Sequence, residues 1–196
     1  QKRDAISPFV RLLWERGTAY EKEVVSKLED PFLDLSGFTE EEKEKRTTEA
    51  MKTQVPLIYS GRISAGDLLG EPDLLSFDSS GYFAGDIKSG SAEEGPEDQS
   101  RPKKHYAVQL ALYTDILERK GLSSERTPYI IDIQGHQVSY QLDQALGKRD
   151  CRTYWEFYQE VLEQAKAIIS LKQTPLPAYS AACKLCHWYS ACLEQL

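Results

Sequence analysis

The segment GEPDLLSFDSSGYFAGDIK, residues 70–88, decides the fold. Its two apolar runs, Asp73 to Phe77 and Tyr82 to Ile87, are short, rich in β-branched and aromatic residues, and separated by a turn. Together with Val55 to Ile63, these runs are typical of three antiparallel strands joined by tight turns. The same segment holds acids and a lysine, so the strands that build the sheet also carry reactive side chains.

Helical patterns lie on both sides of this segment. Ser7 followed by Pro8 is a typical helix start, and Thr39 with Glu42 forms a capping-box pattern. Charged residues dominate the second of these helices, so we expect it to be solvated and peripheral. Helices are expected over residues 8–28, 39–52, 103–119 and 149–171, the last with an apolar stripe from Trp155 to Ile169.

The order of elements is helix, three strands, helix, strand pair and helix, where the strand pair covers 128–134 and 137–142. That order predicts an α/β fold with a mixed central sheet flanked by helices. The 196 residues suit one main domain. We expect it over residues 1–178, with a flexible loop at 89–102, followed by a Cys-rich tail at 179–196.

Composition narrows the classes of function. The formal charge of -7 disfavours a protein that coats nucleic acid by bulk charge, although it leaves room for a local basic groove. No apolar run is long enough to span a membrane, and residues 1–4 do not begin an apolar signal segment. We therefore expect a cytoplasmic protein with no membrane partner, whose four cysteines indicate metal chemistry rather than disulfides.

Asp73, Asp86 and Lys88 form the first candidate site. Residues 86 and 88 point to the same face of their strand, and antiparallel pairing would bring Asp73 close to Asp86. Two carboxylates ~4 Å apart repel by ~4 kcal/mol at an effective dielectric of ~20, and a divalent cation removes that cost. Mg²⁺ takes one or two carboxylates together with waters and phosphate oxygens. The alternative is that Asp73 caps a turn and Asp86 pairs with Lys88 at the surface.

The helix expected after residue 103 carries one polar row on an otherwise apolar surface. His105, Gln109 and Tyr113 are spaced four apart, so they share one helix face. This face follows the strand of Asp86 along the chain, which makes the row a second part of the candidate site. The alternative is a core glutamine beside a half-buried tyrosine.

These motifs resemble a known family when they are taken in order. Gly70-x-Pro72-Asp73, then Asp86-x-Lys88, then Gln109-x-x-x-Tyr113, is similar to the RecB-like branch of the PD-(D/E)XK nucleases. This branch includes the CRISPR-associated exonucleases of the Cas four type and the AddB nuclease domain. The resemblance covers nearly the whole chain. It implies a restriction-endonuclease-like core. It also implies exonuclease-like cleavage of DNA, acting on single strands or ends.

The resemblance also implies roles for single residues. Lys88 would be the catalytic lysine, and Gln109 would position that lysine or the substrate strand, with support from Tyr113. The implied metal is Mg²⁺ or Mn²⁺. Its implied ligands are the carboxylates of Asp73 and Asp86 and the carbonyl of Ile87.

The first helix departs from the family pattern. The family often has His followed by Glu there, with the His on the metal, whereas this chain has Tyr20 and Glu21. A phenol is a poor Mg²⁺ ligand at neutral pH because its pKa is ~10. We therefore expect Glu21 or a water to fill that place, or activity to be reduced. The alternative for Tyr20 is plain core packing.

Cys183, Cys186 and Cys192 form a compact tail motif, which predicts metal or cluster ligation. Zinc sites and 4Fe–4S clusters both use four ligands, and spacing alone does not separate them. Cys151, His187 or a residue upstream of the chain are the candidates for the fourth. The resemblance implies a 4Fe–4S cluster whose first cysteine precedes Gln1, with Zn²⁺ as the alternative.

A basic stretch precedes the polar row: Arg101, Lys103, Lys104 and His105. These residues suit phosphate contacts, which position a strand without reading its sequence. A solvated helix start is the alternative, but the helix dipole disfavours cations at an N-terminus. We therefore expect DNA, single-stranded, as the partner.

Two functions remain open from the sequence. The first is a Mg²⁺- or Mn²⁺-dependent deoxyribonuclease. The second is a catalytically weak nucleic-acid-binding or partner-docking module with the same fold, motivated by Tyr20. We also expect either a protein partner or further domains beyond the chain ends. A redox role is disfavoured, because nothing in the sequence resembles an electron-partner site.

Overall fold

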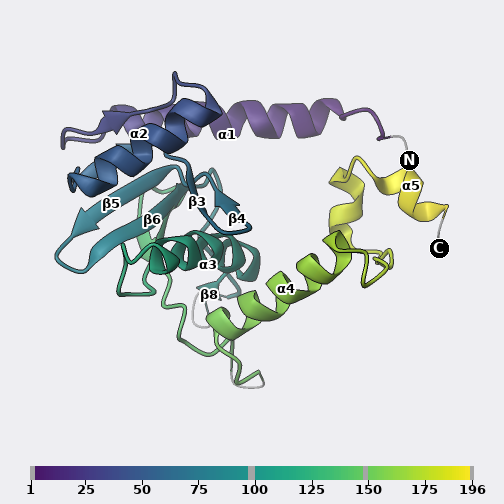
Figure 1. Cartoon of the computed structure of the whole chain (residues 1–196). Helices are drawn as coiled ribbons and strands as arrows, with labels where there is room; N and C mark the ends of the chain where they lie inside the picture. The colour runs from purple at the N-terminus through teal and green to yellow at the C-terminus, as the bar shows by residue number, and fades with distance from the viewer. Residues whose placement is uncertain (1–2, 97–99, 148–149, 195–196) are drawn as a thin grey trace.

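A six-stranded mixed sheet forms the centre of the molecule in the computed structural model, which describes residues 3–96, 100–147 and 150–194 (Figure 1). The pairs β1–β2 and β6–β9 are parallel, and the other neighbours are antiparallel. The mixed sheet flanked by helices confirms the predicted α/β class. In sheet order the strands are β1 (Leu33–Asp34), β2 (Leu57–Tyr59), β5 (Leu74–Asp78), β6 (Gly81–Ile87), β9 (Tyr129–Ile131) and β10 (Gln137–Ser139).

The helices begin where their caps predict. The Ser7 hydroxyl accepts the Val10 N–H ahead of α1, and Thr39 forms a reciprocal capping box with Glu42 ahead of α2. A capping box at Thr153 starts the last long helix later than expected, and residue 149, where the prediction began, lies outside the described residues. The long helices are α1 (Pro8–Ser26), α2 (Glu40–Lys52), α3 (Lys104–Arg119) and α4 (Tyr154–Ile169).

Alternation along the strands sends side chains into two apolar layers. Leu75 and Ile130 enter the larger layer, which the helices α2, α3 and α4 cover. Leu74 and Tyr129 enter a smaller layer on the opposite face, where the second half of α1 packs. This alternation is the period of two expected of strands that are covered on both faces. The strand ends that face the gap between α1 and α3 carry the candidate site.

Two short strand pairs were not predicted. The expected first strand stops at Tyr59, because Ser60 has a φ of 58° and turns the chain into a hairpin, β3 (Ile63–Ala65) and β4 (Leu68–Gly70). The predicted loop at 89–102 contains β7 (Glu93–Glu94) paired with β8 (Arg101–Pro102). Residues 97–99 of that loop lie outside the described residues.

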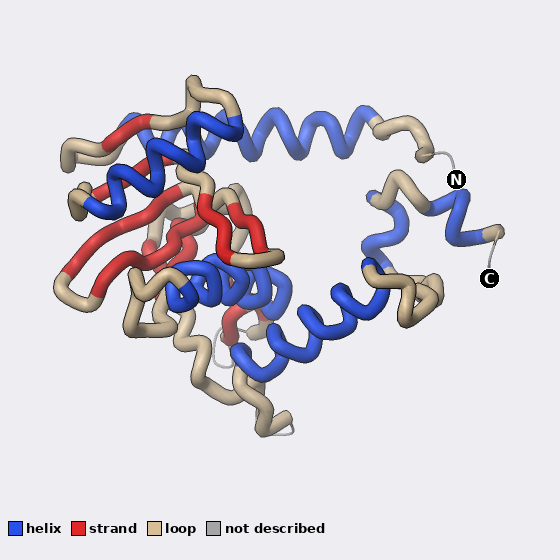
Figure 2. Tube along the Cα trace, in the orientation of Figure 1, coloured by secondary structure: helices blue, strands red, loops and turns tan. Residues whose placement is uncertain are grey.

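Two helices differ from their predicted environment. Helix α2 has a solvated charged face, as expected, but its Ala50 and Met51 are buried in the core. Helix α4 buries Trp155 and Tyr158 against α3, yet Ile169 is 81% exposed, so the predicted apolar stripe does not continue to the helix end. The end of α4 has passed beyond the layer that it packs on (Figure 2). No helix within the described residues is long and apolar enough to cross a membrane.

The two ends of the described chain meet. A 3-10 helix (Ala181–Leu185) and α5 (Tyr189–Leu193) form the tail, which lies beside the start of the chain in Figure 1. The Asp4 N–H donates to the His187 carbonyl at 2.7 Å, and the Asp4 carboxylate accepts the Ser190 N–H at 2.9 Å. The Arg3 guanidinium lies 5.0 Å from the centre of the Trp188 ring.

Candidate active site

The antiparallel pairing of β5 with β6 brings Asp73 and Asp86 together. Leu74 pairs with Gly85, so Asp73, just before β5, lies opposite the end of β6. The Ile87 N–H donates to Asp73 Oδ2 at 2.7 Å, which holds the first carboxylate beside the strand that carries the second. The structure therefore places both predicted acids at one edge of the sheet.

Asp86 is the more deeply buried of the two acids, with 1% of its surface exposed. The Lys88 ammonium forms an ion pair with Asp86 Oδ2. The alternative of an Asp86–Lys88 pair at the surface is therefore correct about the partners, but the pair is not at the surface. This contact lacks hydrogen-bond geometry. Among the described residues, Asp86 Oδ2 is the buried side-chain atom without a hydrogen-bond partner. The Lys88 ammonium is thus a charged partner of this buried oxygen, and the two acids together still carry one negative charge more than this lysine balances.

Burial raises the pKa of both acids. The pKa of Asp73 is raised to about 8, mainly by burial and secondly by the negative charge of Asp86. Burial also raises the pKa of Asp86, while the charge of Lys88 opposes that change. Two acids that resist ionisation together are a functional-site signature, because a cation would relieve the cost of both charges.

Helix α1 contributes Glu21 to the same edge. The charge of Glu21 is close enough to raise the pKa of Asp73. Its carboxylate accepts a hydrogen bond from the Tyr59 hydroxyl, with 2.8 Å between Oε1 and Oη. Tyr20 does not point its oxygen into a ligand position, because its hydroxyl donates to the backbone carbonyl of Asp132.

The polar row on α3 supports the loop that leads to Asp73. The Gln109 amide donates to the Tyr113 hydroxyl at 2.8 Å, and this hydroxyl donates to the Glu71 carbonyl at 3.2 Å. A Cβ on Gly70 would lie 2.5 Å from the Tyr113 ring, so only glycine fits there. The Glu71 side chain pairs with Arg62, which also binds Glu40 at the start of α2. His105, in the same row, is exposed.

The predicted basic residues lie in β8 and around the start of α3, and one of them, Lys103, lies close to Lys88. The ammonium groups of Lys88 and Lys103 are 5.5 Å and 5.3 Å from the centre of the Tyr106 ring. Lys104 lies 5.4 Å from the Phe157 ring, and Arg101 is 3.3 Å from Glu94. Partial desolvation lowers the pKa of the neighbouring His105, and the charge of Lys103 lowers it as well.

The acid pair fits a divalent cation. Mg²⁺ is commonly held by one or two carboxylates with waters and phosphate completing the shell, and Asp73 and Asp86 supply two. Within residues 3–96, 100–147 and 150–194, no three His, Cys, Asp or Glu side chains gather closely enough to hold a metal ion. Glu21 is thus near the pair without completing a closed set, and the Ile87 carbonyl is available beside them.

The tail cysteines are free thiols. Cys183 Sγ accepts the Ser180 N–H at 3.3 Å, and Cys186 Sγ accepts the Trp188 N–H at 3.4 Å. Cys192 lies on α5 and is half-buried, whereas Cys151 is exposed and lies before α4, away from the tail motif in the sequence. The three sulfurs share one segment but do not form a closed ligand set in the described structure.

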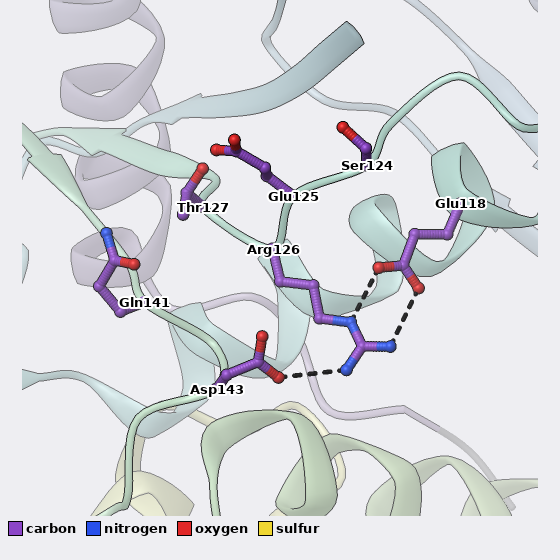
Figure 3. A pocket seen from close by; sticks show the side chains of 7 residues that line it. All are labelled: Glu118, Ser124, Glu125, Arg126, Thr127, Gln141 and Asp143. Carbon is purple, nitrogen blue, oxygen red and sulfur yellow. Dashed lines mark hydrogen bonds and ion pairs between the residues drawn. The ribbon is translucent and has the colours of Figure 1, made fainter. Parts of the chain in front are cut away.

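A separate pocket of about 410 Å³ lies away from these residues (Figure 3). Arg126 donates to both carboxylate oxygens of Glu118, at 2.8 Å and 3.2 Å, and to Asp143 at 3.1 Å. Its guanidinium also lies 3.7 Å from the centre of the Trp155 ring. The arginine is already committed to structural contacts, and no predicted site residue lines the pocket. Its lining residues are Glu118, Ser124, Glu125, Arg126, Thr127, Gln141 and Asp143.

Two buried acids and a lysine at one edge of a mixed sheet suit metal-assisted cleavage of phosphodiesters. The chain matches the family model of the PD-(D/E)XK nuclease superfamily over residues 1–193, and it belongs to that superfamily. Members are generally nucleases and typically use Mg²⁺ or Mn²⁺, so a nucleic acid is the indicated substrate. A search of curated proteins found no match.

Sequence reasoning missed two residues at this edge. Tyr59 contacts Glu21 from a strand that is 38 residues away along the chain, and no local pattern signals such a pair. Tyr129 crosses above β6 so closely that a Cβ on Gly85 would lie 2.3 Å from its ring. The glycine next to Asp86 was the available signal for that close approach.

Proposed function

We propose that this chain is a Mg²⁺- or Mn²⁺-dependent deoxyribonuclease of the RecB-like branch, exonuclease-like on single strands or ends. The observation that carries the proposal is the buried pair Asp73–Asp86 with Lys88 beside it. Neither acid has a sufficient partner within the protein for two full negative charges. A divalent cation and a phosphodiester supply what the pair lacks.

Each residue of the candidate site would have its own role in cation binding or cleavage. Asp73, Asp86 and the Ile87 carbonyl would hold the cation, with Glu21 nearest as a further ligand. When bound, the cation neutralises the acids and polarises the phosphodiester. Lys88 would orient the attacking water or stabilise the charge that develops on the phosphate.

Gln109 and Tyr113 act through the loop at residues 70–73. Their chain of hydrogen bonds ends on the Glu71 carbonyl, which holds the backbone that precedes Asp73. We therefore assign both residues to positioning of the first carboxylate. Positioning of the first carboxylate explains the geometry of Gln109 and Tyr113 more simply than direct contact with the substrate strand does.

The strand of DNA would lie along the start of α3. Lys103 directs its ammonium group onto the Tyr106 ring that Lys88 also contacts, and Lys104 directs its own onto Phe157. Arg101 and His105 are exposed. The lysine and arginine cations of this group bind phosphates without reading bases, and such binding weakens as salt rises. Single strands fit this site because base faces remain free to stack on Tyr106.

The tail would hold a 4Fe–4S cluster, with Zn²⁺ as the alternative. Two of its sulfurs, Cys183 and Cys186, already accept backbone N–H groups, as ligating thiolates commonly do. The fourth ligand would come from the N-terminal side, where Asp4 contacts His187 and Ser190. Iron and zinc analysis of an anaerobic preparation decides between the two metals.

Cleavage of labelled single-stranded DNA across a Mn²⁺ titration tests the proposed activity. We expect Asp86→Asn and Lys88→Ala to lose cleavage by about 10²–10³-fold or more, since each removes a charge placed for the reaction. Asp143→Asn, at the remote pocket, is the matched control and should cleave normally. Normal cleavage by both site variants would overturn the proposal.

A second function is favoured by one observation. The Tyr20 hydroxyl is committed to the Asp132 carbonyl, so the position that often supplies a histidine ligand supplies none here. The chain would then bind nucleic acid or a protein partner and cut poorly. Retention of labelled DNA with no cleavage at any Mg²⁺ or Mn²⁺ concentration would support this function over the first.

A further inference from the structure

Glu21 reaches the candidate site from a helix that is anchored only at its second half. Helix α1 has no fully buried residue, and its first half exposes Phe9 and Trp14 by 57% and 54%. Packing begins at Tyr20 and continues through Val24 and Leu28 against the smaller apolar layer. The half-buried carboxylate of Glu21 on such a helix still has several rotamers, so its direction requires a specific contact.

That contact is the hydroxyl of Tyr59. Tyr59 is 8% exposed, and its backbone is paired with Leu74, the residue that follows Asp73. The Phe32 ring packs edge-on against it, with 6.2 Å between the centroids. Its hydroxyl therefore has a defined position, and it donates to Glu21 Oε1 at 2.8 Å.

The same stretch of β2 also holds the first acid. The Ser60 N–H donates to the Asp73 carbonyl at 2.8 Å. Tyr59, the last residue of β2, thus binds the carboxylate of Glu21, and Ser60, directly after the strand, binds the backbone of Asp73. Tyr59 uses only Oε1, and among the described residues no hydrogen bond reaches the second oxygen of Glu21, which can accept another partner.

We propose that Tyr59 is a positioning residue that orients Glu21 toward the cation held by Asp73 and Asp86. The proposal rests on the proposed function, because it requires that this edge binds a divalent cation. Partners that orient a ligand typically change metal affinity by about 10–100-fold when they are removed. Tyr20 acts on the same helix by binding Asp132, which sets the rotation of α1 without occupying Glu21.

Direct Mn²⁺ binding to the full chain, measured by loss of the free-ion electron paramagnetic resonance signal, tests this inference. Tyr59→Phe removes one oxygen and should raise the Mn²⁺ dissociation constant about 10-fold. Glu21→Gln should weaken binding at least as much, and the double variant should lose no more than Glu21→Gln alone. Tyr129→Phe is the matched control, since Tyr129 is buried on the same sheet face and bonds Ser76 at 2.7 Å.

A metal-dependent readout separates positioning from general damage. In Tyr59→Phe, the Mn²⁺ concentration for half-maximal cleavage should rise by the same factor, and high Mn²⁺ should restore the rate. Wild-type Mn²⁺ affinity in Tyr59→Phe, or equal losses with and without Glu21, would overturn the inference. If Tyr59→Phe does not fold, wild-type affinity in Glu21→Asp, which draws the carboxylate away from Tyr59, overturns it as well.

The variant Asp86→Asn distinguishes a failure of the proposed function from a failure of the role of Tyr59. Asp86→Asn should abolish the tight Mn²⁺ site. Should the wild-type chain bind no Mn²⁺, or should Asp86→Asn bind it equally well, the proposed function fails. Should both behave as expected while Tyr59→Phe matches the wild-type chain, only the role of Tyr59 fails.

Discussion

The sheet edge that carries Asp73 and Asp86 and the terminal region, where the start of the chain meets the tail, are stabilised in opposite ways. At the edge, Asp73 and Asp86 sit within a six-stranded sheet, and apolar layers cover both faces. In the terminal region, a few contacts of Arg3 and Asp4 join the tail, and Leu171 before it is 91% exposed. The edge therefore gets its geometry from the fold, whereas the tail lacks the buried area to order itself in the same way.

This difference indicates where a metal would serve chemistry and where it would serve structure. A cation at the edge would enter a site whose backbone is already fixed, so its removal should leave the fold intact. A cluster or zinc ion in the tail would supply the order that packing does not, as structural metals do in small domains. Each prediction below acts on one region and leaves the other as the reference.

The largest expected effect is on the edge itself. Gly85→Ala would place a Cβ 2.3 Å from the Tyr129 ring, so the ring or the strand next to Asp86 must move. We expect a loss of about 1–3 kcal/mol in the free energy of unfolding, typical of overpacking. Urea denaturation measures it. Gly147→Ala, which meets nothing within 4 Å, is the control, and equal stabilities of the two variants would contradict the close packing.

The second effect is a dependence of stability on pH. The pKa of Asp73 is raised to about 8, above its unfolded value of ~3.9, so the folded state binds the extra proton between these values. The stability of the metal-free chain should therefore fall as pH rises from about 4 to about 8. Thermal unfolding in a chelator at several pH values measures this fall.

Two comparisons sharpen the pH prediction. Asp73→Asn removes the titrating group and should flatten the profile. Added Mn²⁺ should stabilise the chain most at the upper end of the range, where protons no longer compete for the carboxylates. A wild-type profile that is flat, or one that Asp73→Asn leaves unchanged, would show that Asp73 is not the group responsible.

The third effect is confined to the tail. Cys183→Ser should lower the bound iron or zinc and make residues 170–180 sensitive to protease. It should change the unfolding of the core by less than about 0.5 kcal/mol, as expected of a substitution far from the core. Metal analysis with limited proteolysis measures the first two results. Cys151→Ser is the control and should keep the wild-type metal content.

The smallest effect concerns the pocket of Figure 3. Arg126→Ala removes its ion pairs with Glu118 and Asp143 and its contact with Trp155, and we expect a loss of about 1 kcal/mol in stability. DNA cleavage should stay at the wild-type rate. A large loss of cleavage with unchanged stability would mean that this pocket belongs to the functional site.

The sequence predicted the edge better than the terminal region, for a physical reason. Residues 70–88 combine strand periodicity with turn residues, and both signals are local, so the pairing that joins Asp73 to Asp86 followed from them. The prediction of an apolar stripe on α4 up to Ile169 was wrong. Periodicity shows which face of a helix is apolar, but it does not show how far along the helix a neighbouring element extends. The contact between Tyr59 and Glu21 depends on how α1 crosses the sheet, which no local pattern encodes.

The contact between Asp4 and Ser190 spans 186 positions along the chain, nearly the greatest separation that it allows. Because the entropy of loop closure must be overcome before such a contact can form, we expect it to form after the central sheet. The tail thiols would then stay open to solvent while the nuclease core folds. Assembly of this protein would therefore have an order in time, with the sheet edge that carries Asp73 and Asp86 complete before the chain ends are joined.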